Sequence, residues 1–193
     1  MQNATAAFPA PILSIESVSG KLLRVLAGTL FLAASSWISV PTFPVPITMQ
    51  TYAVIVIGAL LGARLGTATV MVWLMEAALG LPVLAHGAAG VAVFLGPTAG
   101  YLFSFPVAAA FVGWLSDRKL DRGVVSSLLS MLGGNAINLS LGVLWLAVAV
   151  GWRGAFLVGF LPFWIGGIAK ALLATASILL VRRSRGRLAH ELR

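Results

Sequence analysis

Lys170 is the residue whose surroundings in the sequence most clearly indicate chemistry. It is the single charged side chain in an apolar run that extends over residues 154–181. A cation inside a membrane is costly unless something pairs with it, so Lys170 needs an acceptor. A ligand oxygen or a buried acid can serve, and the alternative is a side chain that reaches back to the membrane interface. We take ligand binding as the main interpretation.

Glu76 and two asparagines are further polar side chains within apolar runs. Glu76 lies near the end of a run, where it can pair with Lys170, accept a hydrogen bond from a ligand, or face the membrane interface. Asn135 and Asn138 stand at positions i and i+3 of another run and therefore share one helix face. Hydrogen bonds between helices are the commoner role for such asparagines.

A proline-rich segment, PTFPVP at residues 41–46, cannot form a regular helix because proline removes donors and restricts its predecessor. Thr48, Gln50 and Thr51 follow it and offer hydroxyl and amide groups. These side chains can contact a ligand, or the threonines can cap the helix that begins there.

Residue types that enzymes need are scarce. The chain has no cysteine and two histidines, of which His190 lies in the basic C-terminal segment. A metal site or a serine–histidine pair would therefore depend on His86 alone. No glycine-rich loop ends in Lys-Ser or Lys-Thr, so the chain is not expected to hydrolyse ATP. We predict no catalytic residue, no metal and no cofactor.

Charge is confined to short, mostly basic clusters between long apolar runs. Hydrophobic residues make up 60% of the chain and charged residues 9%, whereas about 25% of residues are charged in soluble domains. The net charge is +8, but the basic residues flank the apolar runs instead of covering one face of a soluble domain. We therefore predict a multi-pass membrane protein, and no nucleic acid as a partner.

The apolar runs predict an all-α integral membrane protein with a single domain over residues 1–193. A transmembrane helix needs about 20 apolar residues, and six fit this chain, at residues 22–40, 51–63, 65–79, 98–115, 124–150 and 161–181. Of the 13 lysines and arginines, all but Lys170 and Arg153 then fall on one side of the membrane. That side is predicted to be the cytoplasm, with a polar N-terminal segment (1–20) and a basic tail (182–193).

Two segments on the outer side, 41–50 and 80–97, are apolar but rich in proline or glycine. Irregular backbone cannot face lipid, so we expect these loops to form a lid or a pocket wall, the alternative being plain connections. In the first run, Thr29 and Ala33 form a pair of small residues four positions apart. We expect this face to dock onto a partner helix, because small residues permit close approach.

Four blocks carry a resemblance to a known family. They read VPITMQT at 45–51, GALLGARLG at 58–66, GLPVLA at 80–85 and LGPTAGYL at 95–102. In this order they resemble the BioY family, the biotin-binding S components of energy-coupling-factor (ECF) transporters. The C-terminal half matches more loosely, through Gly142, Trp145 and Lys170.

The resemblance implies a six-helix subunit of the cytoplasmic membrane that captures biotin from outside. Its implied partners are a transmembrane coupling subunit, onto which the Thr29–Ala33 face would dock, and two ATPase subunits that supply the energy. The candidate biotin-binding residues are Lys170, Gln50, Thr48, Glu76, Asn135, Tyr101 and Gly167.

One position departs from the family pattern. The family motif Pro-Gly-Asp-x-x-Lys reads Ile-Gly-Gly-Ile-Ala-Lys at residues 165–170, so Gly167 stands at the place of the aspartate. Glu76 and Asn135 are the candidates to supply the missing acceptor. Two alternatives remain: a carrier for a biotin relative or another small vitamin, and a structural membrane protein without a ligand. A channel or ion-coupled carrier is disfavoured, because Glu76 is the one intramembrane carboxylate that qualifies.

Overall fold

Helices make up most of the part of the chain that the structure describes. The structure, a computed structural model, describes residues 18–191 and the side chains up to Ser184. The prediction for residues 1–17 and for the side chains of the tail from 185 onward lies outside the described residues. The five α-helices are α1 (Val18–Trp37), α2 (Gln50–Ala78), α3 (Ala99–Asp117), α4 (Val124–Ala155) and α5 (Leu161–Glu191).

Short elements connect these helices. A two-stranded antiparallel hairpin, β1 (Ser39–Val40) and β2 (Ile47–Thr48), joins α1 to α2, with Ser39 opposite Thr48. Two 3₁₀ turns, η1 (Ala85–Gly87) and η2 (Val91–Phe94), interrupt the loop between α2 and α3. A π-helical turn, η3 (Phe156–Phe160), links α4 to α5.

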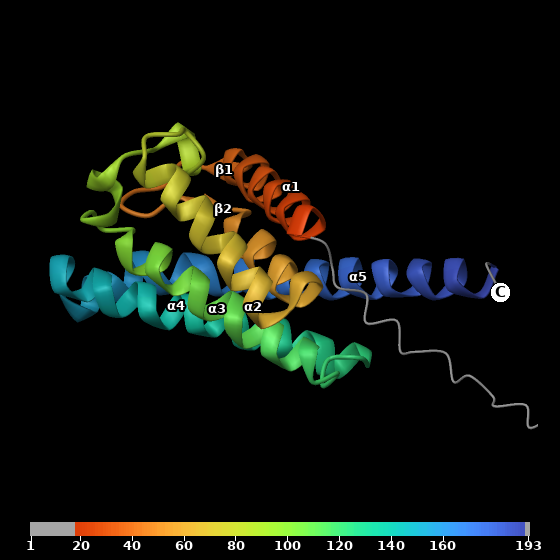
Figure 1. The fold of residues 1–193 in the computed structure, drawn as a ribbon. Helices are drawn as coiled ribbons and strands as arrows, with labels where there is room; N and C mark the ends of the chain where they lie inside the picture. The colour runs from red at the N-terminus through yellow and green to blue at the C-terminus, as the bar shows by residue number, and fades with distance from the viewer. Residues whose placement is uncertain (1–17, 192–193) are drawn as a thin grey trace, which may run out of the picture.

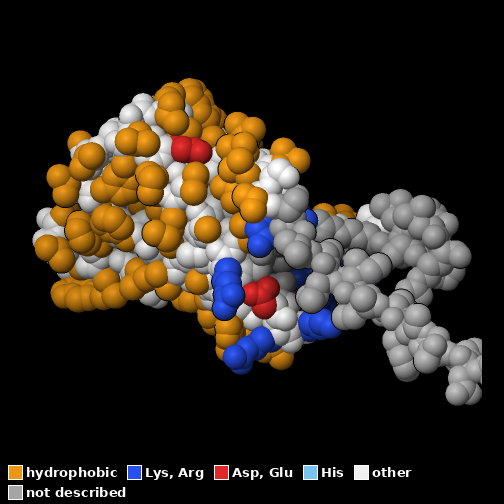
Figure 2. Space-filling model, viewed as in Figure 1, with side chains coloured by type: hydrophobic (Ala, Val, Ile, Leu, Met, Phe, Trp, Pro, Cys, Tyr) orange, Lys and Arg blue, Asp and Glu red, His pale blue; other side chains and the backbone are white. Residues whose placement is uncertain are grey.

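Four helical stretches are long and apolar enough to cross a membrane: Val18–Trp37, Gln50–Ala78, Ala99–Asp117 and Val124–Ser184. Figure 2 shows hydrophobic side chains over most of the visible face, with Lys and Arg gathered toward one end. The start of α1 and the C-terminal end of α5 lie toward that same end (Figure 1). An apolar exterior of this kind suits lipid, and the prediction of an all-α multi-pass membrane protein is confirmed.

Two glycines break the longest helical stretches. Gly62 in α2 has φ 78° and ψ 176°, and Gly151 in α4 has φ 73° and ψ 162°. Only glycine adopts such a conformation without strain. The two parts of α2 fold back along one another (Figure 1), and Gly66 lies directly against Gly58. The side chain of Asp117 stabilises this turn, because its Oδ2 accepts a hydrogen bond of 2.9 Å from the backbone N–H of Ala63.

The core between α1, α2 and α3 supports the outer loops. Trp73 is fully buried, packs against Phe105, and belongs to a cluster with Leu32 and Val70. Its indole N–H donates to the carbonyl of Val83 at 3.1 Å. This bond fixes the loop after α2 to the helix core, so the loop lies over the bundle.

Candidate functional site

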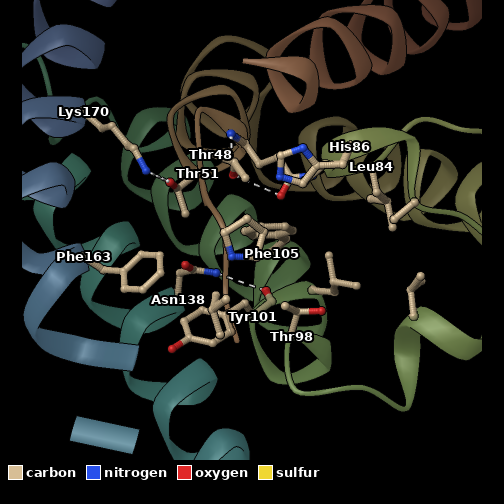
Figure 3. A pocket seen from close by; sticks show the side chains of 17 residues that line it. Thr48, Thr51, Leu84, His86, Thr98, Tyr101, Phe105, Asn138, Phe163 and Lys170 are labelled. Carbon is tan, nitrogen blue, oxygen red and sulfur yellow. Dashed lines mark hydrogen bonds between the residues drawn. The ribbon is translucent and has the colours of Figure 1, made fainter. Parts of the chain in front are cut away.

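A cavity of about 300 Å³ lies between the helix bundle and the outer loops (Figure 3). Its size is at the lower end of the range for small-molecule pockets, about 300–1,000 Å³. Val45 and Pro46 line it from the first outer loop, and Leu84 and Val93 from the second. Both outer loops are therefore walls of this cavity, which we call the first chamber.

The two loops also contact each other. Ser39 Oγ and His86 Nδ1 are hydrogen-bonded at 3.5 Å, and both Val45 and Leu84 are buried beneath the loop surface. Phe43, at the tip of the first loop, is 94% exposed. A loop that closes a chamber with its buried residues can become more ordered when a ligand fills the chamber.

A spin label tests this behaviour, because the chain has no cysteine and a single introduced one is unique. We expect a label on Phe43→Cys to lose mobility when biotin is added, since Val45 and Pro46 then gain a bound neighbour. A label on Val148→Cys, 89% exposed on α4, is the control and should not respond. Equal spectra at Phe43→Cys with and without bound biotin would make the loop a passive connector.

Lys170 reaches the first chamber from α5. Its Nζ donates a hydrogen bond of 3.0 Å to Thr51 Oγ1, at the start of α2 (Figure 3). Of the carboxylates in the described part of the chain, none lies within 4 Å of Nζ. An ammonium group has three donors, and a neutral hydroxyl does not balance its charge. The site therefore presents a positive charge that a ligand oxygen can satisfy.

Gln50 and Thr48 form a fixed polar group in the wall of the first chamber, next to Thr51. Gln50 is buried, and its Nε2 donates to Ser36 Oγ at 3.1 Å. Thr48 Oγ1 donates to Gln50 Oε1 at 3.2 Å and accepts from the backbone N–H of Gln50 at 3.3 Å. Thr48 thus accepts from the first backbone N–H of α2, although the N-cap residue itself is Met49, and it also lines the chamber. Its contact with a ligand stays a prediction.

Asn138 lines the first chamber, although it was not among the candidate biotin-binding residues. Its Nδ2 donates to the backbone oxygen of Tyr101 at 3.1 Å and to Ser104 Oγ at 2.5 Å. Both amide hydrogens are then committed, so the side-chain oxygen remains as an acceptor in the chamber wall. The shared face of Asn135 and Asn138 was the available signal, but it did not show which of the two faces this chamber.

Tyr101 forms part of the same wall. Its hydroxyl donates to the carbonyl of Gly159 at 2.9 Å. Gly142 lies directly beneath the ring, and a Cβ atom at this position would clash with the ring. The ring is therefore held rigidly against α4 and offers an apolar surface to a ligand.

A second cavity of about 230 Å³, the second chamber, adjoins the first between α4 and α5. The two chambers share Thr51, Tyr101, Asn138, Phe163 and Lys170. Asn135 and Gly167 line the second chamber and not the first. They also contact each other, since Asn135 Nδ2 donates to the carbonyl of Gly167 at 3.0 Å.

The predicted site residues are thus divided. Thr48 and Gln50 line the first chamber, Asn135 and Gly167 the second, and Tyr101 and Lys170 both. Glu76 is half-exposed and lines neither chamber, and a pair with Lys170, one of the three roles left open for it, is not formed. The apolar walls Phe105 and Phe163 were also missed, because nothing distinguishes them in sequence from aromatic residues that face lipid.

The predicted docking pair on α1 is not equally available. Thr29 is 3% exposed, and its hydroxyl bonds to the carbonyl of Leu26 at 3.1 Å. The neighbouring Gly28 packs against Thr69 of α2, so this face of α1 is turned into the protein. The docking expectation is therefore wrong for the Thr29 side chain. For the half-buried Ala33 it stays a prediction.

An apolar helical bundle around a chamber with a few fixed polar groups is typical of a membrane protein with a small-molecule site. The chain belongs to the BioY family, whose sequence profile it matches over residues 5–187.

Named relatives agree with this assignment. The chain is 42% identical over 165 residues to a probable biotin transporter BioY of Pyrococcus horikoshii, covering 84% of this chain and 96% of that protein. It is 34% identical over 164 residues to the biotin transporter BioY of Thermotoga maritima, covering the same shares, 84% and 96%.

A solved structure has the same fold. It is the crystal structure of the S-component for biotin from an ECF-type ABC transporter, which matches with a TM-score of 0.76 and 28% identity. The match covers 86% of this chain and 92% of the other.

Proposed function

We propose that this chain is the biotin-binding subunit of an ECF transporter and that it takes up biotin across the cytoplasmic membrane. The main support is Lys170, a cation that has no acidic partner among the described side chains and lies at the wall of the first chamber. The family and the printed names of the relatives support biotin as the ligand.

The first chamber offers groups that suit each part of biotin. The urea of biotin has two N–H donors, for which Asn138 Oδ1 and Gln50 Oε1 are acceptors in the wall. Phe105, Phe163 and Leu84 offer apolar surface to the bicyclic ring. Lys170 then pairs with an oxygen of the ligand, either of the carboxylate or of the urea.

Gly167 stands at the place of the family's aspartate and has no side chain that could accept a hydrogen bond. We assign this acceptor role to Asn135. Glu76 lines neither chamber, whereas Asn135 lies beside Gly167 and donates to its carbonyl. The oxygen of the Asn135 side chain is thereby left to accept from a ligand.

Six membrane crossings follow if the chain reverses at the Gly62 and Gly151 breaks. Both termini then face the cytoplasm, and a coupling subunit with ATPase subunits supplies the energy for release. Reporter fusions at Trp152 and at Arg193 should report opposite sides of the membrane. Finding both on one side would contradict the six-crossing arrangement.

A vitamin panel tests the proposed function. We expect biotin to raise the melting temperature of the purified chain, because a ligand at 100 times its Kd adds about 2.7 kcal/mol to the free energy of unfolding. Thiamine, riboflavin and niacin should have no effect. A shift with another vitamin alone would make the chain a carrier for that vitamin, and no shift with any would favour a structural role.

A further inference from the structure

Apart from Asn135, the residues that line only the second chamber take no part in the contacts proposed for biotin. The second chamber continues from the first past Lys170 and Thr51, which line both. Its walls are largely apolar, with Leu132, Leu139, Phe160 and Trp164 on α4, η3 and α5. A ligand held in the first chamber and paired with Lys170 therefore has space beyond the paired atom.

Gly167 leaves part of this space free of side-chain atoms. A Cβ at Gly167 would meet no atom within 4 Å, so the helix surface there is bare toward the chamber. Gly166 next to it has equally open surroundings but does not line the second chamber. These two glycines form a matched pair: a larger side chain fits at either position, and only one of them fills the cavity.

The distribution of polar groups indicates which end of biotin lies in which chamber. The first chamber is larger and contains the fixed groups of Gln50, Thr48 and Asn138, which suit the urea end. Lys170 stands at the junction of the two chambers, where the other end of biotin, its carboxylate, would arrive. Atoms attached to that carboxyl group would then enter the second chamber.

We propose that the second chamber accepts groups attached to the carboxyl end of biotin, so that the chain also binds uncharged biotin amides with short apolar extensions. This inference rests on the proposed function and adds a class of ligand to it. The amide carbonyl still accepts a hydrogen bond from Lys170, although the charge pairing of the free acid is lost.

Two uncharged ligands isolate the contribution of the extension. Biotin n-butyl amide has three more methylene groups than biotin methyl amide and the same charge. A buried methylene contributes about 0.8 kcal/mol, and about 1.4 kcal/mol corresponds to a factor of ten in affinity. We therefore expect the butyl amide to bind to the unmodified chain at least about tenfold more tightly than the methyl amide does. Titration calorimetry measures both affinities. A butyl amide that binds no better than the methyl amide would overturn the inference.

The matched glycines locate the effect. Gly167→Leu should abolish the advantage of the butyl amide over the methyl amide, whereas Gly166→Leu should preserve that advantage. Ala136→Leu fills the second chamber from α4 and should act like Gly167→Leu, which keeps the test open if one variant does not fold. If both chamber-filling variants retain the advantage, the extension lies elsewhere. Failure of the unmodified chain to bind biotin itself would instead refute the proposed function.

Discussion

Lys170→Met is expected to weaken biotin binding by about 10- to 150-fold. A hydrogen bond to a charged group contributes about 1.5–3 kcal/mol, and about 1.4 kcal/mol corresponds to a factor of ten in affinity. Methionine retains a long apolar side chain and loses only the contact with Thr51, so the fold should survive. Titration calorimetry of the purified variant measures the change.

The control is Arg153→Met, which removes an exposed cation that lines neither chamber. Its biotin affinity should equal that of the unmodified chain. Biotin methyl amide reports which end of the ligand Lys170 holds. If it holds the carboxylate, as we expect, the amide binds more weakly than biotin and loses less on mutation. Normal biotin binding by a Lys170→Met protein with a lowered melting temperature would make Lys170 a structural residue.

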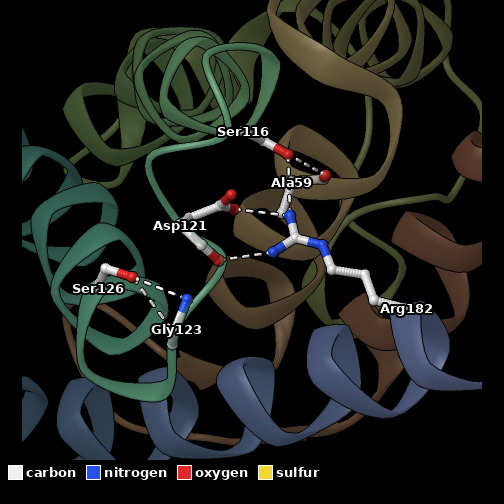
Figure 4. A network of polar contacts seen from close by, with 6 residues as sticks. All are labelled: Ala59, Ser116, Asp121, Gly123, Ser126 and Arg182. Atoms are coloured by element: carbon white, nitrogen blue, oxygen red, sulfur yellow. Dashed lines mark hydrogen bonds and ion pairs between the residues drawn. The ribbon is translucent and has the colours of Figure 1, made fainter.

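Among the variants proposed for this chain, Arg182→Met is expected to lower the free energy of unfolding the most. Figure 4 shows the guanidinium of Arg182, in α5, between the α3–α4 loop and the end of α3. Nη2 donates to Asp121 Oδ2 at 2.7 Å and to Ser116 Oγ at 2.9 Å, and Nη1 donates to the backbone oxygen of Asp121 at 2.6 Å. Ser116 in turn donates to the carbonyl of Ala59 in α2 at 2.8 Å.

Asp121 is 0% exposed, so removal of its partner leaves a buried charge without compensation. Breaking a buried ion pair costs about 3–5 kcal/mol. We expect about 3 kcal/mol, the lower end, because the Arg182 side chain is 18% exposed. Thermal unfolding in detergent measures the loss.

Arg183→Met is the matched control, because Arg183 is the next residue of the same helix and is exposed. Its unfolding free energy should change by less than about 0.5 kcal/mol. Equal losses in the two variants would mean that the contacts of Arg182 do not stabilise the fold.

The elements of the fold were predictable because a membrane limits what a chain can do. Charge-free runs and the position of Arg64 placed a break near residue 64, and the structure has one at Gly62. The isolation of Lys170 and the prolines before Gln50 placed both residues in the chamber wall. These inferences rest on two large free-energy costs, that of a charge in hydrocarbon and that of a proline inside a helix.

The rotation of the helices was not predictable. In a soluble helix the polar side marks the outside, but here the lipid-facing side is as apolar as the core. Nothing in the sequence therefore showed that Asn138 lines both chambers and Asn135 only the second. Nor did it show that Glu76 lines neither chamber and that Thr29 is buried. The burial of Asp121 in a basic loop depends on its contact with Arg182, 61 residues later in the chain.

A crystal structure of the purified chain with bound biotin would show whether Lys170 contacts the ligand in the first chamber. We predict biotin within the first chamber, with one of its oxygens about 2.7–3.2 Å from Lys170 Nζ, in place of or beside Thr51 Oγ1. Biotin bound elsewhere, or biotin in the chamber while Lys170 contacts only Thr51, would contradict this prediction.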